Sequence, residues 1–524
     1  MRRPQPARTA VIGMALAIFV VCAVAPVAHL LFASLGDARA VYATVLLDAR
    51  QRGLLYNTTL LGTASALFAT AVGVPLGIVL ARVPLRGKAL LRLALAAPAL
   101  LPPYVVGLAW VYLGSSSGVL HALTGHDFLS TWTYSLSGAV LVLAVVFYPL
   151  SMLTTEAVMR RIDRRLEEAA LIDAPLRSVM RRISLPLAAP GILATALVIF
   201  VLAVSEFGVP GLLRVRVYTT EVFTAFAALY DFARATLLSL PLLVLSAAVA
   251  SAAAVLFGDR LVTSRRRTGL VPLPLVAWRR PARVAILAVI VVALGLPAAI
   301  LFGEALGARS VAAALTGSGR AMMNSLTLSA TGATVVVAVA VWLGYARARA
   351  GRRAGQAADI VLVVLFAVPS TIVGVGLIGI WNRPGLAGLA YATDAMFLLA
   401  YLARFLPIAV LILAAAMRYV PASHEEAAAV SGAGWLRTMA RIVVPQTWLG
   451  VATAWVITFV LAFGELGVSI LVAPPGESTL PIRIYTIIAN TPASNVASLA
   501  LFQALVILAP LCVLAAVGSR WALR

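Results

Sequence analysis

The stretch EEAALIDAPLRSVMRRISLP occupies residues 167–186, and a similar stretch, EEAAAVSGAGWLRTMARIVVP, occupies residues 425–445. Both are rich in Ala, Glu, Leu and Arg, which favour helix. Pro175 interrupts the first copy, and Gly432 with Gly434 interrupts the second, so each copy is expected to form two short helices. Nearly all the rest of the chain is apolar. The repetition therefore predicts a chain made of two copies of one unit.

The composition is that of a protein that crosses a membrane many times. Hydrophobic residues make up 62% of the 524 and charged residues 11%, with a mean hydropathy of +1.01. The apolar stretches are about 20 residues long and lack a period of two, which favours helical spans over a membrane β-barrel. We predict an all-α membrane protein with twelve transmembrane helices, near residues 10–34, 57–81, 90–113, 137–157, 187–208, 236–257, 284–303, 324–346, 358–380, 395–416, 446–472 and 497–518.

The positive charges predict which loops face the cytoplasm. The net charge is +22, and the arginines cluster in short loops between apolar stretches. Basic loops that alternate with weakly charged ones follow the positive-inside rule. Both termini are then cytoplasmic, as are the loops 81–92, 158–186, 258–283, 347–356 and 417–445. No basic cluster carries stacking aromatic residues on a soluble module, which excludes nucleic acid as a partner.

Matched landmarks extend the repeat over both halves. The pairs are Asn57 and Asn324, Pro102 and Pro369, Pro149 and Pro407, Pro186 and Pro445, and Glu206 and Glu465. Because each half has an even number of spans, the two halves are parallel and related by a pseudo-two-fold axis along the membrane normal. We expect a first transmembrane domain at 1–257, a basic cytoplasmic linker at 258–283 and a second domain at 284–524.

The repeated stretch resembles the EAA loop of ABC importer permeases, whose pattern is E-A-A, three residues, G, nine residues and I-x-L-P. We call residues 160–186 and 418–445 the first and second EAA segments. The second matches the pattern with Val444 in place of Leu, and the first has Ala174 in place of Gly and is one residue shorter after it. The matching residues are Glu168, Ala169, Ala170, Ala174 and Pro186 in the first segment, and Glu426, Ala427, Ala428, Gly432 and Pro445 in the second.

The resemblance implies the type I importer permease fold and a transport subunit without enzyme activity. Each EAA segment would be a coupling helix that sits in a groove of a separate ATPase subunit, of which two copies attach. The chain has no G-x-x-x-x-G-K-[ST] motif, so ATP would be used by that partner and no cofactor would bind here. A separate extracytoplasmic binding protein would deliver the substrate. The location would be the bacterial plasma (inner) membrane, among its lipids.

Fused twelve-span permeases resemble the ferric-iron and thiamine branch of the family. The stretch after the first EAA segment, VSEFGVPGLLRVRVYTTEVF at 204–223, looks most like the ferric-iron members. The resemblance implies a permease for ferric iron. Thiamine, a polyamine, a phosphonate or another small solute remain alternatives.

Three ionisable residues are candidates for the substrate pathway. Glu206 and Glu465 each lie 20 residues after the closing proline of an EAA segment. At ~1.5 Å per residue this is ~30 Å, near the outer end of the membrane. Two related carboxylates there could guide a hard cation, or they could be interfacial acids at span ends. Arg404 lies mid-span and either pairs with Glu465 or lines the pathway, whereas Glu221 is expected in external solvent.

Two other classes of function fit less well. A secondary transporter can also have two parallel six-span halves, but it needs coupling acids in mid-membrane and has no use for two EAA segments. A membrane enzyme would need a nucleophile and base, or a metal cluster, at one membrane face. The four histidines have no ligand spacing, so the sequence predicts no metal site.

Overall fold

The structure of the protein is a computed structural model that describes residues 6–35, 48–115, 118, 121, 124–126, 128–262, 278–306 and 310–522. Within these ranges the chain forms helices and contains no strand. Nine helices of the described residues are long and apolar enough to cross a membrane, and there are twelve such spans if each of three bent pairs counts as one. The predicted all-α fold with twelve spans is confirmed.

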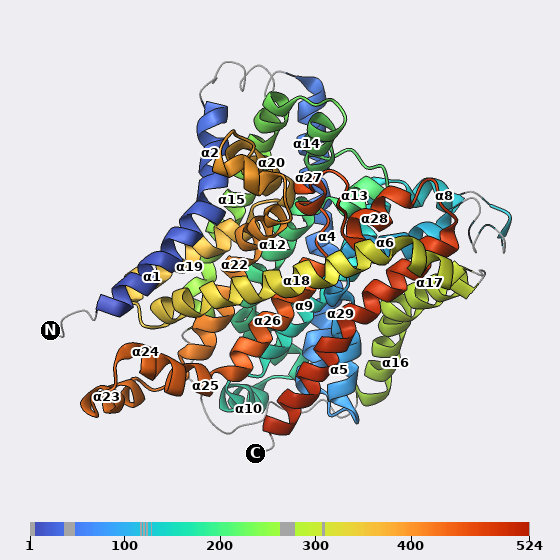
Figure 1. The fold of residues 1–524 in the computed structure, drawn as a ribbon. Coiled ribbons are helices and arrows are strands. Elements are labelled where there is room, and N and C mark those ends of the chain that lie inside the picture. The colour runs from blue at the N-terminus through green and yellow to red at the C-terminus, as the bar shows by residue number, and fades with distance from the viewer. Residues whose placement is uncertain are drawn as a thin grey trace.

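The two halves repeat the same order of helices (Figure 1). In the first half the spans are α1 (Pro6–Phe19) with α2 (Ala25–Leu35), α4 (Ala49–Arg82), α5 (Lys88–Ala96) with α6 (Pro103–Gly114), α9 (Leu136–Met159), α12 (Leu185–Ser205) and α15 (Phe232–Val262). In the second they are α16 (Arg279–Ile290) with α17 (Leu296–Leu306), α18 (Ser310–Ala348), α19 (Arg352–Ala367) with α20 (Ser370–Trp381), α22 (Ala395–Met417), α26 (Trp448–Phe463) and α29 (Ala493–Ala522).

The first span of each half packs against the other half. Phe19 and Cys22 of the first span lie in one apolar cluster with Val336 of α18 and Leu406 of α22. In the second half, Ile286 of α16 packs among buried residues of the first half, and Figure 1 shows α16 beside α5. The two halves are therefore interlocked and share one core.

The third span of each half is broken near its middle. The helix pairs α5–α6 and α19–α20 bend by 89° and 94°. Pro102 and Pro369 cause the breaks, because a proline lacks the N–H that helix continuation needs and forces the preceding residue into an extended conformation. Leu101 and Val368 are indeed extended. The fifth span of the second half also bends, by 76° at Thr447. Thus the predicted spans 90–113 and 358–380 are bent pairs, not straight helices. The predicted span 446–472 begins at the bend near Thr447, and its helix α26 ends at Phe463.

Two glycines allow α4 and α9 to touch backbone to backbone. A Cβ atom added at Gly73 would lie 2.6 Å from the carbonyl oxygen of Tyr148, and one at Gly77 would lie 2.5 Å from that of Met152. In the second half, a Cβ at Gly344 would lie 2.8 Å from the Cβ of Leu413. Small residues at such crossings are how membrane helices obtain close packing. The two long helices of the first half thus form one rigid unit.

The described part of the predicted linker at 258–283 is helical at both ends. Helix α15 continues to Val262, and α16 begins at Arg279. Residues 263–277 of the linker lie outside the described residues.

Candidate functional site

Both EAA segments fold into the two short helices that the sequence predicts. The first contains α10 (Arg164–Asp173) and α11 (Leu176–Val179), and the second contains α23 (Ala422–Val430) and α24 (Trp435–Thr438). Each pair leads through a π-helical turn into the next span. Figure 1 shows α23 and α24 projecting from one edge of the bundle, on the side where α10 also lies. Both segments are therefore presented at the same end of the molecule, the α10/α23 end.

The two copies end their first helix differently. Gly432 has φ +78°, and the N–H groups of Gly432 and Ala433 donate to the carbonyls of Ala429 and Ala428 (3.1 and 2.9 Å). This is a Schellman end, which favours glycine because only glycine adopts positive φ at little cost. In the first copy, Ala174 is extended with φ −142°. Alanine fits there because no left-handed residue is needed, which explains why this segment departs from the family pattern.

Each EAA segment exposes an apolar side chain beside its glutamate. Glu168 and Glu426 are exposed. At equivalent positions, Ile172 is 82% exposed and Val430 is 85% exposed. An apolar group this open on a short helix rimmed with charge is typical of a surface that a partner covers.

The acids that fix these helices to the bundle are Glu167 and Glu425, one residue before the predicted glutamates. The Arg82 guanidinium at the end of α4 donates to both carboxylate oxygens of Glu167, and each side chain is 2% exposed. The Ser184 hydroxyl donates to the same carboxylate (2.6 Å). A buried pair with this geometry attaches α10 rigidly to the end of α4.

The second half repeats this attachment with different partners. Arg349 donates to Glu425, and the hydroxyl of Tyr345 donates to the other carboxylate oxygen (2.7 Å). The side chains of Arg349 and Glu425 are 19% and 18% exposed, so this pair is more open than the first. Sequence reasoning missed both pairs. The signal was present, because Arg82 and Arg349 are separated by the same offset as Pro102 and Pro369.

Glu206 and Glu465 lie just past the ends of α12 and α26, inside the protein. The Oε1 atom of Glu206 accepts from the N–H of Gly208 (2.9 Å), and that of Glu465 accepts from the N–H of Val468 (3.0 Å). A Cβ added at Gly208 would be 3.0 Å from the Cβ of Tyr104, which places Glu206 beside the break in the third span. The same Cβ would lie 3.0 Å from Oε1 of Glu206 and 3.4 Å from Cδ2 of Leu466, the residue after Glu465, so the acids come from facing segments. They therefore form a partly buried acidic pair between the halves.

Arg404 binds backbone carbonyls at the break in the second half. Its Nη1 donates to the carbonyls of Phe366 (3.3 Å) and Val368, and its guanidinium lies over the Phe366 ring. Ser205 of the first half donates to the carbonyl of Ala367 (3.3 Å). The break at Pro369 leaves these helix-end carbonyls without intrahelical donors, and the two side chains satisfy them. The sequence predicts that Arg404 either pairs with Glu465 or lines the pathway. In the structure the Arg404 side chain binds these carbonyls and forms no ion pair with Glu465 among the described residues.

A buried hydrogen-bond chain joins the halves beside the acids. The hydroxyl of Tyr104 donates to Oε1 of Gln503 (2.6 Å), and Nε2 of Gln503 donates to the carbonyl of Phe463 (3.1 Å). Tyr104 and Gln503 are 4% and 0% exposed. Every group in this chain has its partner, so it holds α6, α26 and α29 in one arrangement.

Replacing Gln503 with leucine should lower the free energy of unfolding by about 1–3 kcal/mol, because a buried hydroxyl and a buried carbonyl lose their partners. Thermal unfolding of the purified protein in detergent measures the loss. The double variant Tyr104→Phe/Gln503→Leu should lose less than the sum of the two single losses, because it removes both hydrogen-bonding side chains. Strictly additive losses would mean that the two side chains act independently.

No group of three or more His, Cys, Asp or Glu side chains that could hold a metal ion occurs among the described residues.

The family model for the inner membrane component of binding-protein-dependent transport systems matches the chain twice, at residues 73–266 and 337–522. The chain belongs to this family of transport permeases. Each match contains one complete EAA segment and one acid of the Glu206–Glu465 pair. The permease is therefore a fusion of two family domains, as its internal repeat predicts.

Some curated relatives match both halves of the permease, and others match about a third of it. The Fe(3+)-transport system permease protein FbpB 2 of Haemophilus influenzae is 24% identical over 84% of this chain and 85% of its own length. The molybdenum transport system permease protein ModB of Escherichia coli K12 is 31% identical over 31% of this chain and 72% of its own length. A putative 2-aminoethylphosphonate transport system permease protein, PhnU of Salmonella typhi, is 31% identical over 30% of this chain and 56% of its own length.

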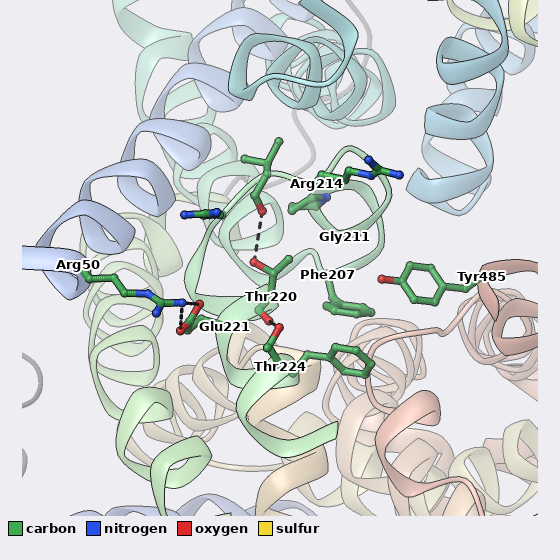
Figure 2. Close-up of a pocket in the computed structure, with 12 residues that line it drawn as sticks. Arg50, Phe207, Gly211, Arg214, Thr220, Glu221, Thr224 and Tyr485 are labelled. Carbon is green, nitrogen blue, oxygen red and sulfur yellow. Dashed lines mark hydrogen bonds and ion pairs between the residues drawn. The ribbon is translucent and has the colours of Figure 1, made fainter. Parts of the chain in front are cut away.

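The permease has a cavity of about 560 Å³ at the end opposite the EAA segments, between α4, the stretch after Glu206 and α28 (Leu480–Ile487). Figure 2 shows Arg50 paired with Glu221 on one side of it and Tyr485 of the second half facing it from the other. The Glu221 side chain is only 11% exposed and lies 2.8 Å from Arg50, so its prediction as a solvated residue is wrong. We call this cavity the Arg214 pocket, after the arginine on its rim.

Proposed function

We propose that the permease imports ferric iron, which an extracytoplasmic binding protein delivers and which ATP hydrolysis by separate subunits drives across the membrane. The assignment of iron as the substrate depends on how much of this chain each relative matches. The Fe(3+) permease relative aligns with 84% of the chain, across both halves, whereas the molybdenum and phosphonate relatives align with about a third of it. A relative that shares the fused arrangement is the better guide to a pathway formed between the halves.

The EAA segments are the proposed docking sites for two ATPase subunits. Their exposed glutamates, small alanines and open apolar residues at the α10/α23 end support this role. That end is cytoplasmic in this proposal, and so are both chain termini. The proposed domains are residues 1–257 and 284–524, joined by a cytoplasmic linker. ATP is used by the partner subunits, and this chain contributes no catalytic residue.

Glu206 and Glu465 are the proposed acidic lining of the pathway. They approach each other from the two halves beside the broken third spans, where a conformational change of the bundle would open or close the space between them. Carboxylate oxygens suit a hard cation such as ferric iron. Arg404 holds the adjacent break in shape, so that the acids keep their position.

Uptake of ⁵⁵Fe(III) by iron-starved cells tests the substrate. Cells from which this gene and redundant iron systems have been deleted should regain uptake when the gene is restored, and ATP depletion should abolish that uptake. Unchanged uptake in the deletion strain would exclude iron and leave the permease assignment intact.

The double variant Glu168→Lys/Glu426→Lys should abolish ATP-driven uptake, because two charge reversals oppose docking at both EAA segments. Quantitative immunoblotting of membranes should show normal insertion, since both side chains are exposed. Arg177→Gln, another exposed change in the same segment, is the matched control and should retain uptake. Full uptake by the double variant under ATP depletion would instead indicate a secondary transporter.

A small oxyanion is the second candidate substrate. The relatives named for molybdenum and for 2-aminoethylphosphonate transport support it, and so does the presence of three arginines around the Arg214 pocket. Parallel uptake assays with radiolabelled molybdate and phosphonate distinguish it from iron.

A further inference from the structure

Positively charged side chains outnumber negatively charged ones in the lining of the Arg214 pocket. Three arginines and one acid line it. Arg50 is neutralised by Glu221 at 2.8 Å, whereas Arg214 and Arg216 are exposed and pair with no carboxylate among the described residues. The guanidinium of Arg214 lies 5.9 Å from the centre of the Tyr134 ring, which leaves its N–H groups available. A cavity of about 560 Å³ with two guanidinium groups that pair with no described carboxylate has room and charge for a small anion.

The internal repeat allows the chain around Arg214 to be compared with the equivalent chain of the second half. Asn57 donates to the carbonyl of Arg216 (3.2 Å), and Asn324 donates to that of Ser478 (3.4 Å). Two residues later, each backbone N–H binds a hydroxyl of the preceding long helix, Tyr218 to Thr58 (3.0 Å) and Leu480 to Ser325 (2.6 Å). These paired contacts align the loop that precedes Tyr218, the first loop, with the loop that precedes Leu480, the second loop, residue by residue.

In that alignment Arg214 corresponds to Gly476. Gly476 has φ +82°, and Arg214 has φ +54°. A left-handed conformation suits glycine, whereas it strains a residue with a Cβ atom. The first half therefore holds an arginine in a conformation that the second half assigns to glycine. Strain of this kind persists where the side chain has a role.

The loops also differ in charge. Glu477 of the second loop pairs with Arg320 and accepts from Asn324 (2.7 Å), so the second loop carries a compensated acid. The first loop has Arg214 and Arg216 instead. The basic pocket is therefore a property of the first half alone and does not follow from the shared fold.

Tyr485 supplies a hydroxyl from the second half. A Cβ added at Gly211 would lie 2.7 Å from this hydroxyl oxygen, so glycine at 211 leaves room for the hydroxyl in its present position. The hydroxyl has no hydrogen-bond partner among the described residues, and Figure 2 shows it facing the pocket. Burial raises the pKa of Tyr485, so the hydroxyl stays protonated and can donate. Residues of both halves that can donate hydrogen bonds thus line one cavity.

We propose that the Arg214 pocket binds a small oxyanion, a phosphate, phosphonate, molybdate or carboxylate group, through the guanidinium groups of Arg214 and Arg216 and the hydroxyl of Tyr485. Planar guanidinium groups bind such anions with paired N–H···O bonds. If the cargo is iron, as in the proposed function, the bound group is the oxyanion ligand of a ferric chelate. If the cargo is an oxyanion, it binds directly.

Equilibrium dialysis of the purified full chain in nanodiscs tests the site, with ³²P-orthophosphate, ⁹⁹Mo-molybdate and ⁵⁵Fe(III)-citrate as probes. We expect saturable binding of at least one probe to the wild type. Arg214→Gly should weaken it by about 10- to 100-fold, the range for losing a charged hydrogen bond. This variant relieves backbone strain, so its thermal midpoint should not fall. Arg52→Gln, an exposed arginine of α4 outside the pocket, is the control and should bind like the wild type.

The probes separate the two sources of the anion. Binding of ferric citrate alone supports a chelate, and binding of phosphate or molybdate alone supports a free oxyanion. The proposal is overturned if no probe binds the wild type, or if both Arg214→Gly and Arg216→Gln bind as the wild type does. Cellular ⁵⁵Fe uptake is measured separately, so a failure of the iron assignment and a failure of this site give different results.

Discussion

Arg82→Met is expected to lower the free energy of unfolding by about 3–5 kcal/mol, the usual cost of removing one partner of a buried ion pair. It leaves the Glu167 carboxylate 2% exposed and without its cation. Because α10 loses its ion pair with α4 and keeps the Ser184 hydroxyl on Glu167, the first EAA segment should be coupled less firmly to the bundle. Uptake should fall to background even in the membrane-inserted fraction. Thermal unfolding and ⁵⁵Fe uptake, normalised to inserted protein, measure the two effects.

Arg349→Met is the matched control, because it removes the equivalent arginine from a pair that is 19% and 18% exposed. Solvent screens that carboxylate, so the loss of stability should be smaller. The exchange Arg82→Glu/Glu167→Arg should recover part of the stability and uptake, since the opposite charges remain in contact. Equal losses in the two halves would show that burial of the first pair has no mechanical or energetic importance.

Gly77→Val should prevent accumulation of the folded protein. The new Cβ would lie 2.5 Å from the carbonyl oxygen of Met152, and the obstacle is backbone of α9, which cannot rotate away. The two helices must separate along their contact, and an overpacked core contact costs about 1–3 kcal/mol or more. Size-exclusion chromatography and thermal unfolding of detergent extracts measure the result.

Gly53→Val is the control for Gly77→Val, because it makes the same substitution on α4 at a position where the new Cβ meets open space. Nothing lies within 4 Å of the Cβ position at Gly53. Valine is a better helix former than glycine, so stability should be unchanged or slightly higher. A variant at Gly77 that is as stable as this control would show that α4 and α9 are not held at the close distance.

The large-scale organisation was predictable because it depends on repeated and local signals. Apolar stretches about the length of a membrane crossing give the spans. Paired landmarks such as Pro102 and Pro369 give the two-fold repeat, and helix formers interrupted by Pro175 or Gly432 give the two short helices of each EAA segment. Each of these signals is found in one short stretch of sequence or in the comparison of two short stretches.

The missed features depend on contacts between distant segments. The breaks at Pro102 and Pro369 had a local signal, but these prolines were used only as landmarks of the repeat within the predicted spans 90–113 and 358–380. Glu167 and Glu425 were not singled out from the sequence, because their arginines lie 85 and 76 residues away. Glu221 looked solvated for the same reason, since Arg50 is 171 residues away. Arg404 binds carbonyls that are free only because the third span breaks, which sequence alone did not reveal.

The exchange of first spans between the halves has a consequence for synthesis. The segment of α1 and α2 leaves the ribosome before its packing partners in α18 and α22, which follow it by roughly 300 residues or more. At about 5–20 residues per second, this span waits in the bilayer on the order of 15–60 seconds for them. The native bundle can close only after the second half has been inserted. A nascent chain that stops before α18 leaves exposed to lipid the face of its first span that packs against α18 and α22 in the finished protein.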